Sequence, residues 1–151
     1  MKWITREHAK VDRIACPWLI KNFIDKDAKF LFVPSHKVLE IMKNENAIPF
    51  DIPNVELGHH GDECSFDAII KKYELDKKNP ELLILAEIVR GADTEKRHLT
   101  PQSAGLAAIA AGFHVISKDD YDNMVKQFPV YDALYAFAKA DNKEKFLTSR
   151  H

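Results

Sequence analysis

The chain has 151 residues, of which 46% are hydrophobic and 30% are charged, as in one soluble globular domain. Its formal net charge of −1 argues against broad electrostatic binding of nucleic acid, which usually needs a basic face. Two cysteines, Cys16 and Cys64, are too few for the disulfide framework of a small secreted domain. With no signal-peptide core and no apolar run of membrane-spanning length in the sequence, we expect a cytoplasmic protein that binds neither membrane nor nucleic acid.

The first half of the chain is expected to alternate short strands and helices. Strands or extended segments are predicted at residues 3–6, 30–33 and 47–53. Helices are predicted at residues 12–24 and 38–42. Pro17 is expected in the first turn of the earlier helix, because a proline deeper in a helix removes a hydrogen bond and clashes with the turn before it.

The second half is expected to be helical. Helices are predicted at residues 66–73, 80–89, 101–111, 121–127 and 130–140. Ser65 is the expected N-cap of the helix that follows it, while Gly91 and Gly112 are expected to end two of the later helices. The charged tail at 141–151 is expected to fray. The predicted fold class is therefore α+β: a mainly helical single domain over residues 1–140 with a small sheet of short strands.

Reactive side chains are concentrated at residues 58–67, Gly-His-His-Gly-Asp-Glu-Cys-Ser-Phe-Asp. Neutral imidazole is a common transition-metal ligand, and the glycines let a partner approach closely. Because adjacent side chains point opposite ways in an extended chain, either His59 or His60 is a ligand while the other orients or shields it. Glu63 is a candidate metal ligand or general base, and Cys64 a candidate nucleophile. The competing interpretation is a solvated loop with capped turns.

A second polar group spans residues 87–93. Glu87 and Arg90 share a helix face, which is also the spacing of an ordinary intrahelical ion pair. Asp93 is expected in a loop at the helix end, a good position for a metal ligand or an acid–base group. Arg13 opens another helix, where its planar guanidinium is suited to an oxyanion.

Together these groups predict a metal centre with an oxyanion beside it. The candidate metal ligands are His59, His60, Glu63, Glu87 and Asp93. Arg13 and Arg90 would hold the oxyanion. A mixed histidine and carboxylate set suits iron, manganese or zinc, and ligand type does not choose among them. The hypothesis requires the segments around residues 60 and 90 to meet in space.

Several blocks of sequence then match one family in order. They are Val11–Ile20, Phe30–Pro34, Ile48–Asp51, Glu56–Gly61, Cys64–Asp67, Glu87–Asp93 and Tyr131–Tyr135. Over about residues 3 to 138 the chain resembles the C-terminal domain of the ChrB-type chromate-resistance proteins. The resemblance implies chromate as the oxyanion and a part in chromate-responsive control. It implies no DNA binding for this domain, because a separate N-terminal region precedes it in the full-length regulators, and it assigns no reaction to particular residues.

Three functional hypotheses follow. The first is a metal-centred ligand-binding domain that senses a small oxyanion. The second is a metal-dependent enzyme, hydrolytic or redox, in which Glu63 or Asp93 is the general base, or Cys64 supplies a catalytic thiol. The third is a metal-free anion-binding or interaction module. The sequence leaves a homo-oligomer open under each of them.

Overall fold

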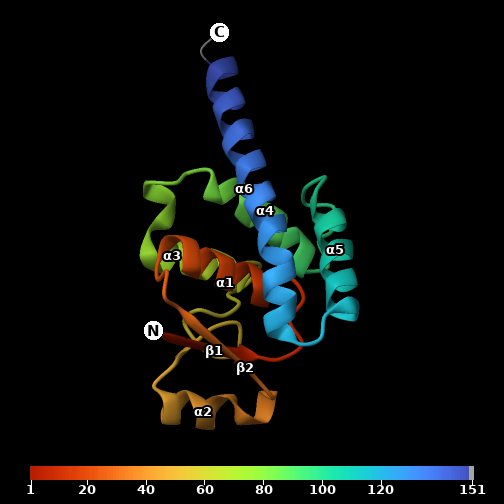
Figure 1. Ribbon diagram of the computed structural model, residues 1–151. Helices are drawn as coiled ribbons and strands as arrows, with labels where there is room; N and C mark the ends of the chain where they lie inside the picture. The colour runs from red at the N-terminus through yellow and green to blue at the C-terminus, as the bar shows by residue number, and fades with distance from the viewer. Residues whose placement is uncertain (150–151) are drawn as a thin grey trace.

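A short parallel sheet lies between helical layers (Figure 1). In the computed structural model, which describes the backbone of residues 1–149 and the side chains of residues 1–143, the strands are β1 (Lys2–Arg6), β2 (Lys29–Val33) and β3 (Ile48–Pro49). The strand order is β2-β1-β3, so the chain crosses from one side of the central strand to the other. Parallel neighbours need crossover connections, which contain α1 (Asp12–Phe23) and α2 (Val38–Glu45).

The two faces of the sheet are covered by different helices, with α1 on one side and α2 on the other (Figure 1). Successive strand residues point to opposite faces, so Trp3 joins the main core with α1, whereas Ile4 packs in a smaller cluster with Val38 of α2 and Ile52. Both β1 side chains are fully buried. The α1 and α2 crossovers therefore lie on opposite faces of the sheet. This matters for function, because ligands of parallel sheets commonly bind at the carboxyl ends of two neighbouring strands whose connections leave to opposite faces.

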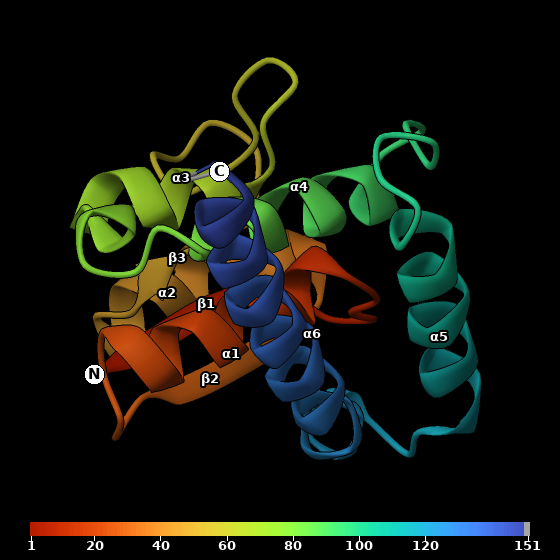
Figure 2. The ribbon, with the colours of Figure 1, turned by 90° about the horizontal axis from the view of Figure 1, so that it is seen from above.

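The remaining helices pack on the α1 side of the sheet. They are α3 (Ser65–Tyr73), α4 (Leu82–Asp93), α5 (Ser103–Ile116) and α6 (Asp120–Ser149), with single 3-10 turns η1 (Ser35–Lys37) and η2 (Leu75–Lys77) between elements. The helix α6 packs against α1, α4 and α5 and projects beyond the body at its C-terminal end (Figures 1 and 2). The fold is α+β with a mainly helical domain and a small sheet, which confirms the predicted class.

Two predictions about helix starts were wrong. Pro17 lies inside α1, which already begins at Asp12. The proline removes only the hydrogen bond to the Arg13 carbonyl, and burial of most of the helix outweighs that loss. Cys64, not Ser65, is the N-cap of α3: its N–H donates to Asp67 Oδ2 at 2.9 Å, and the two residues form a reciprocal capping box.

Two predictions about helix ends were also wrong. Gly91 lies within α4, where a Cβ atom would come within 2.3 Å of Ser103 Oγ, so this glycine allows α4 and α5 to approach closely. Gly112 lies within α5, which ends at Ile116. The two helices predicted on either side of Pro129 are one continuous helix, α6.

The helix α6 extends through most of the predicted charged tail, to Ser149, and residues 150–151 of that tail lie outside the described residues. Fraying of the tail stays a prediction. Among the described helices none combines the length and the apolar character needed to cross a membrane.

Candidate functional site

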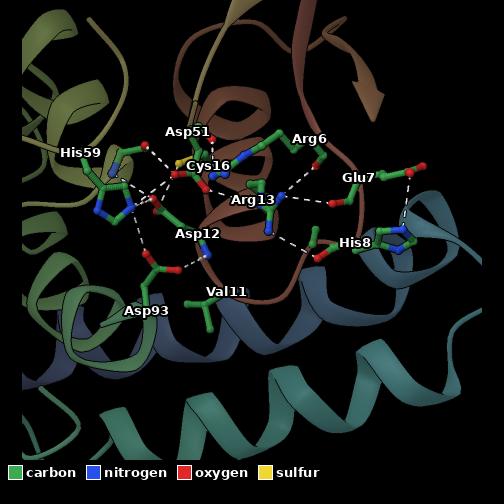
Figure 3. A network of polar contacts seen from close by, with 12 residues as sticks. Arg6, Glu7, His8, Val11, Asp12, Arg13, Cys16, Asp51, His59 and Asp93 are labelled. Carbon is green, nitrogen blue, oxygen red and sulfur yellow. Dashed lines mark hydrogen bonds and ion pairs between the residues drawn. The ribbon is translucent and has the colours of Figure 1, made fainter. Parts of the chain in front are cut away.

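Three carboxylates converge on one imidazole at the carboxyl end of the sheet (Figure 3). His59 Nε2 lies 3.2 Å from Asp51 Oδ1, 3.2 Å from Asp93 Oδ2 and 3.6 Å from Asp12 Oδ2. Four segments supply these residues: Asp12 opens α1 after β1, Asp51 follows β3, His59 lies in the loop before α3, and Asp93 ends α4. Since β1 and β3 are parallel neighbours whose crossovers lie on opposite faces, their carboxyl ends bring Asp12 and Asp51 together.

Asp12 is the deepest of the three acids, with 1% of its surface exposed. Its carboxylate accepts hydrogen bonds from the backbone N–H groups of Ser65 at 2.8 Å and Phe66 at 3.2 Å. The buried carboxylate therefore caps α3, a helix other than its own. The Cys16 thiol also donates to it, at 3.4 Å.

Asp93 and Asp51 are held in a similar way. Asp93 Oδ1 accepts the backbone N–H of Asp12 at 3.3 Å, so its other oxygen is left facing His59. Asp51 Oδ1 accepts the Ser65 hydroxyl at 3.2 Å, and its Oδ2 lies 3.5 Å from Arg13 Nε. The Asp51 backbone has φ = 48°, in the left-handed region. These contacts fix the carboxylates in place, as outer partners do for metal ligands.

Burial and crowding shift the protonation of this group. Burial raises the pKa of Asp12 well above its ordinary value, and the neighbouring Asp51 and Asp93 carboxylates raise it further. Burial also raises the pKa of Asp93. The hydrogen bond to Asp51 raises the pKa of His59 to about 9, against the opposing effect of desolvation. With no metal ion bound, the protonated imidazole and the Arg13 guanidinium beside Asp51 are therefore the positive charges next to the three carboxylates at neutral pH.

The group lies in a pocket of about 360 Å³. Small side chains of α4 and α5 form one wall, namely Ala92, Ala107 and Ala111. Basic side chains complete the lining, namely Arg6, Lys10, Arg13 and Arg97. A pocket with a carboxylate floor and basic walls can hold a cation together with an anion.

The spacing of the donor atoms fits a metal ion. One donor atom each from Asp12, His59 and Asp93 can be chosen so that all lie within 4.8 Å of one another. Metal–ligand bonds of roughly 2.0–2.2 Å place neighbouring ligand atoms about 3.0–3.6 Å apart. The separations from His59 Nε2 to Asp93 and Asp12, 3.2 and 3.6 Å, fall in that range. One nitrogen and two oxygens suit zinc, manganese or iron.

The sequence of this chain matches a known protein family. The family model described as "ChrB, C-terminal domain" matches residues 3–138, which include every residue of the pocket. The chain belongs to this family. It is 29% identical over 142 residues to Protein ChrB of Cupriavidus metallidurans, an alignment that covers 94% of this chain and 42% of that protein. The chain thus spans less than half the length of this curated ChrB relative, and no solved structure matches it.

The pocket of this ChrB-family domain brings together three of the residues expected from the sequence. His59 and Asp93 are in contact, so the segments around residues 60 and 90 do meet. Arg13 lines the same pocket. Its guanidinium also donates to the backbone carbonyls of Arg6 at 3.2 Å and Glu7 at 3.1 Å, which leaves it only partly free for a ligand.

Other predicted residues lie elsewhere. His60 does not line the pocket, and its Nε2 lies 2.7 Å from the Glu56 carbonyl oxygen. His60 pairs through its backbone with Glu63, and both line a separate hollow of about 110 Å³ with Lys71, whose Nζ is paired with Glu63. Adjacent residues of an extended segment point opposite ways, so the two histidines were expected to separate.

Glu87, Arg90 and Cys64, the remaining predicted residues, do not line the pocket. Glu87 is exposed on α4, and six residues along a helix bring Asp93 to a different face. Arg90 forms a bidentate pair with Asp67, at 3.1 and 2.6 Å. Cys64 is fully buried, and burial raises the pKa of its thiol far above the ordinary value. A thiol that stays protonated is a poor nucleophile.

Asp12 and Asp51 are the site residues that sequence reasoning missed. The sequence placed Asp12 only at the start of the helix predicted at residues 12–24, and Asp51 only within the extended segment predicted at residues 47–53. The signal that could have found them is that each follows a strand of the parallel sheet, but only the pairing of β1 with β3 makes those strand ends neighbours.

Proposed function

We propose that this ChrB-family domain binds a divalent transition metal ion through Asp12, His59 and Asp93, and that the bound metal and the basic walls of the pocket hold a small oxyanion. The observation that carries the proposal is the convergence of the Asp93 and Asp12 carboxylates on His59 Nε2, within 3.2 and 3.6 Å. Chromate is the oxyanion that membership of the family suggests.

Charge balance supports a cation at this point. Three carboxylates brought around one nitrogen repel one another, and an uncompensated buried charge is strongly destabilising. A protonated His59 and the Arg13 guanidinium beside Asp51 contribute one positive charge each, against the three carboxylates. A divalent ion at the centre of the same group contributes two and replaces the proton on the imidazole.

The walls of the pocket support an anionic second ligand. Lys10 and Arg97 are exposed side chains at its mouth, and the Arg13 side chain is 20% exposed. Arg90, which the sequence suggested for this role, is paired with Asp67 and does not line the pocket. We therefore assign the oxyanion to Lys10, Arg97 and the free part of the Arg13 guanidinium.

The test is metal binding by matched variants. Elemental analysis and calorimetric titration with Zn²⁺, Mn²⁺ and anaerobic Fe²⁺ are applied to the wild type, Asp93→Asn and Asp12→Asn. We expect about one ion per chain in the wild type and a Kd at least roughly a hundredfold weaker in Asp93→Asn, because a ligand is lost. Asp12→Asn provides a second, independent loss of a ligand. Its single amide oxygen replaces only one of the two Asp12 oxygens that accept the Ser65 and Phe66 N–H groups, so its folding is checked by thermal denaturation.

Glu63→Gln and Glu87→Gln are the controls, because they make the same chemical change outside the pocket. Both are expected to bind metal like the wild type. A wild type that binds none of the three ions, or a loss of binding in Glu63→Gln equal to that in Asp93→Asn, would overturn the proposal.

A further inference from the structure

A line of polar side chains on α6 faces the loop that leads into the pocket. The positions are three or four residues apart, so they lie on one face of the helix. Asp120 accepts the backbone N–H groups of His8 at 3.0 Å and Ala9 at 2.8 Å. Three further side chains donate to successive carbonyl oxygens of the loop: Asn123 to Ala9 at 3.1 Å, Gln127 to Lys10 at 3.3 Å and Tyr131 to Val11 at 3.3 Å.

Three members of this line, Asn123, Gln127 and Tyr131, are buried and are called the polar stripe below, whereas Asp120 is partly exposed. Asn123 is 1% exposed, and Gln127 and Tyr131 are fully enclosed. Buried polar groups stabilise a protein less well than apolar side chains of the same size unless every group is paired. Gln127 Oε1 finds no hydrogen-bond partner within the described residues. Helix packing alone therefore does not account for an amide at this position.

What the stripe does fix is the path of residues 8–11. Lys10 and Val11 line the pocket, and the next residue is Asp12. The backbone N–H of Asp12 also donates to Asp93 Oδ1, so a shift of this loop would displace two of the three candidate metal ligands. His8 has φ = 66°, a conformation that a residue with a side chain keeps only when its surroundings hold it there.

We infer that Asn123, Gln127 and Tyr131 are positioning residues, which set the geometry of the metal pocket through the backbone of residues 9–11. This inference rests on the proposed metal site. Their hydrogen bonds to the loop go to the backbone carbonyls of residues 9–11 and not to the ligand atoms, so their effect on binding passes through the loop.

The test uses Gln127→Met, which keeps the length of the side chain but removes its donor to Lys10. Co²⁺ is the probe, because its visible absorption reports the coordination geometry and a titration gives Kd. We expect Co²⁺ to bind about tenfold more weakly, as for loss of an outer partner of a metal site, with an altered absorption spectrum. The melting temperature without metal is expected to change little, because the variant removes the unpaired Gln127 Oε1 but also the Nε2 donor that reaches the buried Asn123 Oδ1 at 2.7 Å.

Two further variants make the result specific. Tyr131→Phe removes only a hydroxyl and is expected to weaken Co²⁺ binding in the same direction, and it carries the test if Gln127→Met fails to fold. Leu134→Ala, on the same helix but outside the stripe, is expected to lower the melting temperature and leave Kd and the spectrum unchanged.

The outcomes separate the two proposals. A wild type that binds Co²⁺, with stripe variants that bind it equally well and show the same spectrum, would overturn the positioning role and leave the metal site standing. The same loss of affinity in Leu134→Ala would also overturn it, because general destabilisation would then explain the effect. A wild type that binds no Co²⁺ would overturn both the positioning role and the site on which it depends.

Discussion

His59 and His60 are neighbours in the chain, but the charged groups around them differ. On the His60 side, Glu63 is paired with Lys71 at the surface. On the His59 side, three acids from separate segments surround one imidazole, and two of them, Asp12 and Asp51, are buried. The first arrangement satisfies its own charges, whereas the second has more negative than positive groups at its centre. The candidate site is therefore marked by the convergence of residues that are distant in the sequence, and not by the density of reactive residues along it.

The sharpest test of this comparison removes one histidine at a time. His59→Ala is expected to weaken Zn²⁺ binding at least roughly a hundredfold, or about 2.7 kcal/mol, because a direct ligand is lost. His60→Ala is expected to leave Kd within about twofold of the wild type. Calorimetric titration of both variants checks this, and equal losses in the two would remove the distinction between the two sides of the loop.

A second prediction concerns a polar pair that we assign to structure alone. Arg90→Met is expected to lower the free energy of unfolding by roughly 2–3 kcal/mol, because Asp67 is left as a buried, unpaired charge. The loss is smaller than for a fully buried pair, since 24% of the Arg90 side chain is exposed. Urea denaturation measures the loss, and Zn²⁺ affinity is expected to be retained. A stable variant with lost metal binding would instead place Arg90 in the site.

The third prediction is a pH dependence of the metal-free domain. The folded pKa of His59, about 9, lies above its ordinary value of 6.5, so its contribution to stability is complete below pH 6.5 and is lost as the pH rises to about 9. The raised pKa values of Asp12 and Asp93 act in the same direction, because folding then favours their protonated forms.

Urea unfolding between pH 6 and 9.5 measures this dependence. Stability is expected to fall across that window in the wild type and to fall less in His59→Gln, which has no titrating imidazole at this position. A rise in wild-type stability over the window, or an equally steep fall in the variant, would contradict the assignment.

The smallest expected effect is at the surface. Glu63→Gln removes the charge paired with Lys71, whose side chain is 69% exposed, and is expected to change the free energy of unfolding by less than about 0.5 kcal/mol. Thermal denaturation at low and at high salt checks it. A loss above about 1 kcal/mol would show that the His60 side of the loop has a larger structural part than its exposure suggests.

Much of the fold followed from local pattern. The strands at residues 3–6 and 30–33 and the helices after Cys64 and Pro80 were predicted because the apolar residues repeat with the periods of those elements. The errors came from tertiary packing. The helix α4 continues through Gly91, where the missing Cβ leaves room for Ser103 of α5. Pro17 is tolerated within α1 because that helix is buried along most of its length. Neither neighbour can be seen in a local window of sequence.

Only part of the candidate site could be predicted from the sequence. His59 and Asp93 were each chosen because reactive residues next to glycine and at a helix end are common in binding sites. That they meet was a condition of the metal-centre hypothesis, which the sequence did not establish and the structure meets. Asp12 and Asp51 could not be found in that way. They become neighbours only through the pairing of β1 with β3, a strand of two residues whose partner no sequence pattern specified.

Anomalous X-ray diffraction from crystals of this domain grown with Zn²⁺ locates a bound metal ion without reference to any variant. We expect one strong peak at the zinc edge within bonding distance of Asp12, His59 and Asp93. A peak between His60 and Glu63 instead, or no peak at either place in crystals saturated with zinc, would contradict the proposed metal site.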